Sequence, residues 1–314
     1  MTVAWVVGST GLLGSALRRE LCRWGTPLFS APQRLSWSHA AELEQQLAAS
    51  VCSYAKVAAS DPPWEIYWAA GVGTMGSAAS DLEPETQALA VLLQLVESNP
   101  TLASLPGAVA FASTAGAIYA GAQAEIIDES TPAGPTTAYA RAKLAQEALV
   151  QAFAERNANA SALLARISTI YGPGQSAGKQ QGLLAHMARC VVRNKPVQIF
   201  VPFDTIRDYI CVDDAASAIV TALRAGAGQH RILTKIIASE VPTTIAEIVS
   251  IYKRLARRAP RIVTSANRLS TLYARRVQFR SIRMPDRASS RRTTLAVGIA
   301  QLLDAELAAY SRAA

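Results

Sequence analysis

The feature that most constrains this chain is a glycine-rich turn close to its N-terminus. The apolar residues 3–7 lead into the turn, and residues 15–21 then have the composition of a helix. In such a strand–turn–helix unit, glycines permit the tight turn, a close backbone approach to a pyrophosphate, and the packing of helix on strand. The helix N-terminus adds free N–H groups and a partial positive charge. The spacing G-x-x-G-x-x-G also occurs for backbone reasons alone, but its context here predicts a phosphate-binding turn made of Gly8, Ser9, Thr10, Gly11, Leu12, Leu13 and Gly14.

Apolar strands alternate with helical segments through about residue 170, which predicts a parallel sheet of βαβ units. Beyond that point glycine and proline interrupt the pattern more often. We therefore predict an α/β fold: a Rossmann-type doubly wound parallel sheet over residues 1–167, followed by a smaller C-terminal substrate lobe over 168–314. The segment near 205–225 is predicted to return to the large domain. The expected strands are 64–70, 108–112 and 161–167, and the expected helices are 41–49, 85–97, 137–155, 215–225 and 244–255.

The composition is that of a globular cytoplasmic protein. No apolar run reaches the roughly 18 residues that a membrane span needs, and no signal peptide is recognisable. The cysteines lie far apart in the sequence, so we expect reduced, buried thiols rather than disulfides or metal ligands. The three histidines are equally scattered, and no metal site is expected. The cysteines are Cys22, Cys52, Cys190 and Cys211, and the histidines are His39, His186 and His230.

The net charge of +8 is concentrated in the last third of the chain, where thirteen arginines and lysines lie between residues 253 and 292. Such a stretch could bind nucleic acid. It carries few aromatic residues, however, and matches no nucleic-acid-binding module. We favour an anionic small-molecule substrate and a solvated surface, with no nucleic-acid or membrane partner.

A phenol and an ammonium group lie four residues apart at Tyr139 and Lys143, and therefore on one face of the predicted helix. The ammonium would favour the phenolate and lower the tyrosine pKa toward a useful acid/base range. Ser113 and Thr114 follow a predicted strand, at the sheet edge where ligands of open α/β sheets bind. Either hydroxyl could bind a substrate oxygen, and either could instead cap a turn.

These residues give the chain a resemblance to the extended short-chain dehydrogenase/reductases, of the NAD-dependent epimerase/dehydratase type that acts on nucleotide sugars. Seven motifs match in the family's order along nearly the whole chain. They are Gly8-x-x-Gly11-x-x-Gly14, Ala69-Ala70-Gly71, Ser113-Thr114-Ala115-Gly116-Ala117-Ile118-Tyr119, Asp128-Glu129, Tyr139-x-x-x-Lys143, Tyr171-Gly172-Pro173-Gly174-Gln175, and the run from Arg207 to Ala215.

The resemblance implies a role for each of these groups. Tyr139 would transfer a proton, Lys143 would bind the nicotinamide ribose and lower the tyrosine pKa, and Thr114 (less favoured, Ser113) would bind the reacting oxygen. Ala69, Ala70 and Gly71 would contribute to the cofactor site. The turn at 173–174 would border nicotinamide and substrate. Arg207 would bind the substrate diphosphate, although a pair with Asp208 or Asp213 is an alternative.

Two departures from the family pattern bear on cofactor and substrate. An NAD enzyme usually offers an acid to the ribose 2′-hydroxyl after the second strand, but this chain has Ser30 followed by Arg34, which favours NADP over NAD. The family's usual asparagine in the helix near residues 85–90 is also missing, and Glu85-Thr86-Gln87-Ala88 stands there.

The resemblance further implies a possible homodimer through the helix 137–155.

The predicted function is that of an NAD(P)-dependent epimerase or 4-ketoreductase acting on a nucleotide-linked sugar. Dehydration ranks last because Ala115 and Gly116 follow Thr114, where dehydratases of the family usually have an Asp-Glu pair. The alternatives are a reductase of a carbonyl not linked to a sugar and a dinucleotide-binding protein without catalysis.

Overall fold

The computed structural model describes residues 2–175, 182–257, 259–265, 275–284 and 292–313. Its centre is a six-stranded parallel sheet in the order β2-β1-β3-β4-β5-β9. These strands are β1 (Val3–Val7), β2 (Leu28–Phe29), β3 (Trp64–Trp68), β4 (Gly107–Thr114), β5 (Ala160–Ile167) and β9 (Ile232–Ile237). This confirms the predicted α/β class.

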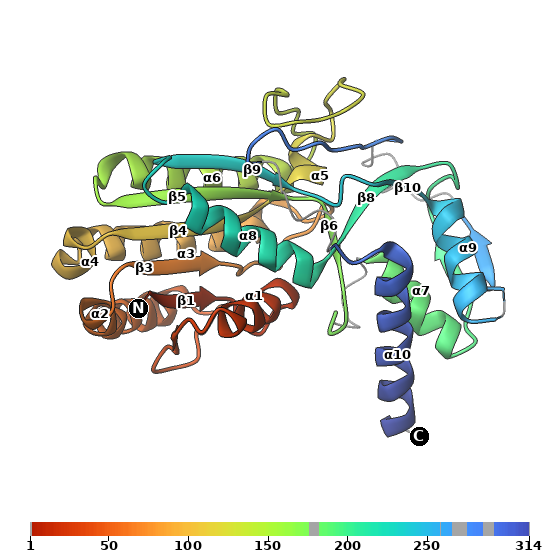
Figure 1. Ribbon diagram of the computed structural model, residues 1–314, viewed down its shortest axis with the longest axis horizontal. Coiled ribbons are helices and arrows are strands. Elements are labelled where there is room, and N and C mark those ends of the chain that lie inside the picture. The colour runs from red at the N-terminus through yellow and green to blue at the C-terminus, as the bar shows by residue number, and fades with distance from the viewer. Residues whose placement is uncertain (1, 176–181, 258, 266–274, 285–291, 314) are drawn as a thin grey trace.

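Helices cover both faces of the sheet (Figure 1). Along β1, Val3, Trp5 and Val7 pack in one apolar cluster, while Ala4 and Val6 pack in another, as the alternation of side chains along a strand requires. The first cluster includes side chains of α2 (Ala40–Ser60), α3 (Ala79–Ser98), α4 (Pro100–Ser104) and α6 (Ala138–Arg156). The second includes side chains of α1 (Leu12–Arg23) and α8 (Val212–Gly226).

The strand order predicts that a ligand would bind at the carboxyl edge of this sheet. From β1 the chain moves outward to β2 and then returns to the other side of β1 as β3. The two crossover connections therefore diverge at β1, and open α/β sheets bind ligands at such a switch point. The loops that follow β1, β3 and β4 meet there.

Smaller elements form a third apolar cluster beyond this edge, at the right of Figure 1. One sheet has the order β10-β8-β6, and β11 pairs with β7. The strands are β6 (Thr169–Tyr171), β7 (Val197–Ile199), β8 (Ile206–Cys211), β10 (Pro242–Thr244) and β11 (Ile262–Thr264). The helices are α7 (Leu183–Val192), α9 (Ile245–Leu255) and α10 (Leu295–Ala313), and the short α5 (Ala115–Ile118) follows β4.

Several elements differ in extent from the sequence prediction. Helix α3 begins at Ala79, six residues before the expected start, although it contains Pro84. Pro84 is the sixth residue of α3 and removes one backbone hydrogen bond from its second turn, but the helix still buries apolar side chains on both sides of it, from Leu82 to Val96. Helix α2 continues to Ser60, eleven residues beyond the expected end. Its buried side chains continue to Ala58, so packing on the sheet extends it.

Candidate active site

The glycine-rich turn is closely packed against the loop after β3. Gly8 has φ +85°, and a Cβ built on it would lie 2.6 Å from the backbone nitrogen of Ala70. A Cβ on Gly14 would lie 2.1 Å from the carbonyl oxygen of Gly8. Gly11 is the N-cap of α1, and its N–H donates to the carbonyl oxygen of Gly8 (3.0 Å). The turn is therefore built from backbone, with the N-terminus of α1 directly behind it.

The loop after β3 is fastened by a carboxylate that the sequence analysis did not assign to the site. Glu85 on α3 accepts hydrogen bonds from the backbone N–H groups of Val72 (2.5 Å) and Gly73 (2.7 Å), both at its Oε1. The missing asparagine had drawn attention to this stretch of sequence. The partners of Glu85, however, lie twelve and thirteen residues away and were not predictable from spacing.

Tyr139 and Lys143 lie on the first two turns of α6, which Thr137 caps by accepting a hydrogen bond from the Ala140 N–H (3.2 Å). The Lys143 Nζ lies 6.0 Å from the centre of the Tyr139 ring and donates to the carbonyl oxygen of Ala112 at 3.4 Å. The ring of Tyr139 contacts the loop after β3, since a Cβ on Gly73 would lie 3.2 Å from Tyr139 Cδ2. The structure thus brings the predicted pair to the carboxyl ends of β3 and β4.

Burial shifts the pKa values of this pair in opposite directions. The pKa of Tyr139 is raised by burial and by the negative charge of Glu85, whereas the sequence predicted that Lys143 would lower it. Burial also lowers the pKa of Lys143 to about 8, although Glu85 and Glu147 act in the other direction. The expected direction for Tyr139 was wrong because loss of solvent and the charge of Glu85, which was not predicted, both favour the neutral phenol.

Of the two candidate hydroxyls at the end of β4, Thr114 accepts a hydrogen bond from the Ala117 N–H (3.4 Å) and caps α5. Ser113 is buried and donates to Glu147 Oε1 (2.6 Å). Glu147 is also held by Arg166 of β5 at 2.7 Å, and Arg166 donates to the Tyr119 hydroxyl at 2.6 Å. The side chain of Ser113 is therefore part of a buried polar network that includes Glu147 of α6.

The other predicted binding residues lie on separate segments. Arg34 is exposed in the loop between β2 and α2. Arg207 lies on β8, beside Thr243 of β10, and donates to the carbonyl oxygen of Ile206 (2.7 Å). The two acids considered as its partners have contacts of their own: Asp208 accepts from Ser168 (2.6 Å), and Asp213 pairs with Arg19 (2.6 Å). Gly174 has φ +91° in the turn that follows β6.

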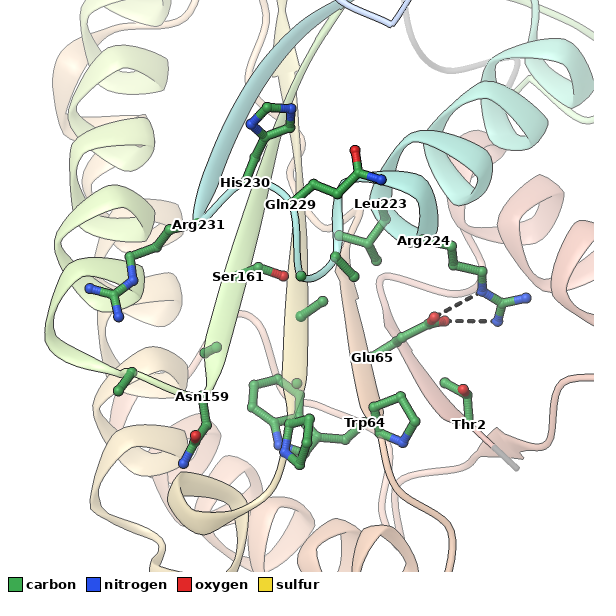
Figure 2. A pocket seen from close by; sticks show the side chains of 18 residues that line it. Thr2, Trp64, Glu65, Asn159, Ser161, Leu223, Arg224, Gln229, His230 and Arg231 are labelled. Atoms are coloured by element: carbon green, nitrogen blue, oxygen red, sulfur yellow. Dashed lines mark hydrogen bonds and ion pairs between the residues drawn. The ribbon is translucent and has the colours of Figure 1, made fainter.

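A cavity of about 590 Å³ lies at the opposite end of the sheet. Figure 2 shows Trp64, Asn159 and Ser161 on its wall, with the ion pair between Glu65 and Arg224 at one side. These residues belong to the amino ends of β3 and β5 and to the end of α8. None of the predicted site residues lines this cavity.

Several whole-chain expectations can be compared with the described residues. All four cysteines are free, but Cys22 and Cys52 are exposed on the outer faces of α1 and α2, so the expectation that they are buried was wrong for these two. Within the described ranges, no helix combines the length and apolarity of a membrane span. Of the basic C-terminal residues, Arg258, Arg268, Arg287 and Arg291 lie outside the described residues.

Comparison with solved structures shows the same fold over essentially the whole chain. RMD from Pseudomonas aeruginosa, complexed with NADPH, is 22% identical with a TM-score of 0.79, and the match covers 98% of this chain and 100% of that one. UDP-glucose 4-epimerase from Thermus thermophilus, complexed with NAD, is 19% identical with a TM-score of 0.77, and the match covers 98% and 99%.

Sequence comparison adds a curated relative and a family. The dTDP-L-rhamnose 4-epimerase of Burkholderia thailandensis is 32% identical over 96 residues, or 30% of this chain. That match spans about a quarter of the relative's length, 26%. The model of the NAD dependent epimerase/dehydratase family matches residues 4–233, which include the glycine-rich turn, Tyr139, Lys143 and Arg207. The chain therefore belongs to the NAD dependent epimerase/dehydratase family.

Proposed function

We propose that this protein is an NAD(P)-dependent epimerase or 4-ketoreductase that acts on a nucleotide-linked sugar. One arrangement supports this proposal above all others. The glycine-rich turn contacts Ala70, the following loop contacts the Tyr139 ring, and Lys143 reaches the end of β4. The glycine-rich turn, which would hold the dinucleotide, and the pair Tyr139 and Lys143 thus lie at the same edge of the sheet, where its strands have their carboxyl ends. This arrangement suits a reaction in which a hydride passes between the dinucleotide and the sugar while a proton is transferred to or from the sugar oxygen.

The cradle fits a dinucleotide because any side chain at Gly8 or Gly14 would occupy the close backbone contacts described above. Backbone N–H groups at the start of α1 would hold its pyrophosphate. When bound, the dinucleotide supplies the site that accepts or returns a hydride. Arg34 and the absence of an acid after β2 favour NADP, because a guanidinium can pair with a 2′-phosphate.

The chain's own residues would handle the proton and the reacting oxygen. Tyr139 gives the proton to, or takes it from, the sugar oxygen, and Lys143 binds the cofactor ribose and stabilises the phenolate. Thr114 accepts a backbone hydrogen bond, which leaves its hydroxyl proton for the substrate oxygen. Ser113 donates instead to Glu147, so Thr114 is the better candidate. Arg207 would bind the diphosphate of the substrate.

The acid/base assignment is tested by replacing Tyr139 with phenylalanine. Tyr139→Phe should bind NADPH or NADH as tightly as the wild type, because the cradle is unchanged. Its turnover of nucleotide sugars should fall by about 10²–10⁴-fold, the usual contribution of a positioned acid/base. Tyr310→Phe, at an exposed tyrosine of α10, is the matched control and should keep full turnover.

Two further measurements on the wild type and these variants identify the cofactor and the reaction. Thermal shifts with NAD(H) and NADP(H) should show a larger stabilisation by NADP(H). Product analysis then separates a reduced sugar from an epimer. Undiminished turnover in Tyr139→Phe would refute the acid/base role. Cofactor binding by the wild type without turnover of any nucleotide sugar or simple carbonyl would favour a binding protein instead.

A further inference from the structure

Glu85 is the charged group in this site that the family pattern does not supply. It is half-buried on the second turn of α3, and its Oε1 accepts the N–H groups of two consecutive residues, Val72 and Gly73. Its Oε2 lies beside Gly71, where an added Cβ would be 3.0 Å away. The loop 71–73 is therefore folded around one carboxylate, which satisfies two backbone donors at once.

This loop lies directly on the proposed acid/base residue. A Cβ on Gly73 would lie 3.2 and 3.3 Å from two ring carbons of Tyr139, and 2.4 Å from Leu82 Cδ2. Gly73 thus lies next to the tyrosine ring, and a side chain at this position would push against Tyr139 and Leu82. Because Glu85 holds the Gly73 N–H at 2.7 Å, it fixes the backbone that sets the position of the ring.

We propose that Glu85 is a positioning residue of the active site, whose carboxylate holds the loop 71–73 against Tyr139 and places a negative charge beside Lys143. This inference rests on the proposed function, in which Tyr139 and Lys143 act as a pair. It assigns to Glu85 two separable contributions. One is geometric and needs only a hydrogen-bond acceptor, and the other is electrostatic and needs the charge.

The charges around the pair explain why the electrostatic contribution matters. The negative charge of Glu85 on α3 acts on both Tyr139 and Lys143, and that of Glu147, four residues after Lys143 on α6, acts on Lys143. Glu147 is already bound by Arg166 of β5, whose guanidinium also contacts the Tyr119 hydroxyl. Glu85 instead binds neutral backbone donors. Its charge raises the pKa of both Tyr139 and Lys143, so the ammonium stays protonated to a higher pH than burial alone would allow.

Glu85→Gln separates the two contributions. The glutamine carbonyl oxygen can accept both N–H groups, since it has two lone pairs, but the charge is gone. Glu83→Gln is the matched control, because Glu83 is exposed on the same helix and its loss changes the net charge equally. Glu85→Ala removes both the charge and the acceptor.

The first measurement needs no turnover. The chain has six lysines, so the ε-methylene NMR signals of a ¹³C-lysine-labelled protein are few, and Lys143→Arg identifies that of Lys143. We expect a pKa near 8 in the wild type, a lower pKa in Glu85→Gln and the wild-type pKa in Glu83→Gln. An unchanged Lys143 pKa in Glu85→Gln would overturn the electrostatic contribution.

The second measurement reports on the loop. Amide hydrogen exchange at Val72 and Gly73 should be faster in Glu85→Ala than in the wild type, and Glu85→Gln should restore most of the protection. Equal exchange in all three proteins would overturn the geometric contribution.

Kinetics then connect Glu85 with the reaction. The pH profile of kcat should move to lower pH in Glu85→Gln, because both pKa values fall, while Glu83→Gln should keep the wild-type profile. An unmoved profile contradicts the inference. If the wild type turns over no nucleotide sugar, the proposed function fails, and the NMR and exchange results still decide whether Glu85 positions this pair.

Discussion

At the scale of single residues, the packing of the glycine-rich turn depends on the absence of a side chain at Gly14. A Cβ on Gly14 would lie 2.1 Å from the carbonyl oxygen of Gly8, which is backbone and cannot rotate away. We expect Gly14→Ala to weaken NADP(H) binding by at least about tenfold and to lower the free energy of unfolding by about 1–3 kcal/mol, as overpacking does. Calorimetric titration and urea unfolding would measure the two effects.

The control for this substitution is Gly116→Ala in α5. Gly116 is exposed, and a Cβ there meets nothing within 4 Å. Its replacement should leave the free energy of unfolding unchanged or slightly raised, because alanine restricts the unfolded chain. If Gly14→Ala also keeps the wild-type stability and cofactor affinity, the turn can rearrange. The close contact between Gly14 and the Gly8 carbonyl oxygen is then not required for cofactor binding.

At the scale of elements, a largely buried ion pair joins β3 to α8, which covers one face of the sheet. Arg224 donates to both oxygens of Glu65 at 2.8 and 2.9 Å, and Tyr67 donates to the same carboxylate at 2.9 Å. The Glu65 side chain is only 6% exposed, so Arg224→Ala would leave a buried charge without its cation. We expect a loss of about 3–5 kcal/mol in the free energy of unfolding, measured by urea denaturation.

Two further proteins test the cause of this loss. Arg156→Ala breaks the exposed pair between α6 and Glu97 of α3, which solvent screens, and should unfold at nearly the wild-type urea concentration. The double variant Glu65→Gln/Arg224→Met removes both buried charges and should be more stable than Arg224→Ala. A double variant as unstable as the single one would show that packing of the arginine, rather than the unpaired carboxylate, causes the loss.

The elements also show what sequence patterns could and could not predict. Buried strands such as β4 and β5 are continuous apolar runs, and the predicted limits agree with the structure within two residues. The pairing of Tyr139 with Lys143 was predictable because both lie on one helix. The contacts of Glu85 with the loop 71–73, and of Ser113 with Glu147, depend on how distant segments pack, and no local periodicity encodes them. For that reason the fold was predicted more completely than the environment of the site.

At the scale of the whole molecule, the segment 275–284 contacts both the six-stranded sheet and the small sheet β10-β8-β6. At one end, its backbone pairs with Ile206 of β8, and in the middle it pairs with Ile127. At the other end, Lys235 of β9 donates to the Ser281 hydroxyl (3.0 Å) and to the carbonyl oxygens of Arg283 (2.6 Å) and Met284 (3.0 Å). One buried ammonium of the large sheet therefore holds the end of a segment that begins beside the small sheet.

Removal of the Lys235 ammonium should increase the mobility of the C-terminal end of the segment 275–284. In Lys235→Met, an unbranched side chain of similar length keeps the packing, but three acceptors lose their donor, which should cost about 1–3 kcal/mol. The exposed Arg280 and Arg283 should then be cut sooner by trypsin, with fragments identified by mass spectrometry. Lys195→Met, at an exposed turn, should be cut at Arg280 and Arg283 as slowly as the wild type. Equally slow cleavage in Lys235→Met would show that the backbone pairs with Ile206 and Ile127 suffice to hold the segment, and that Lys235 does not join the two sheets.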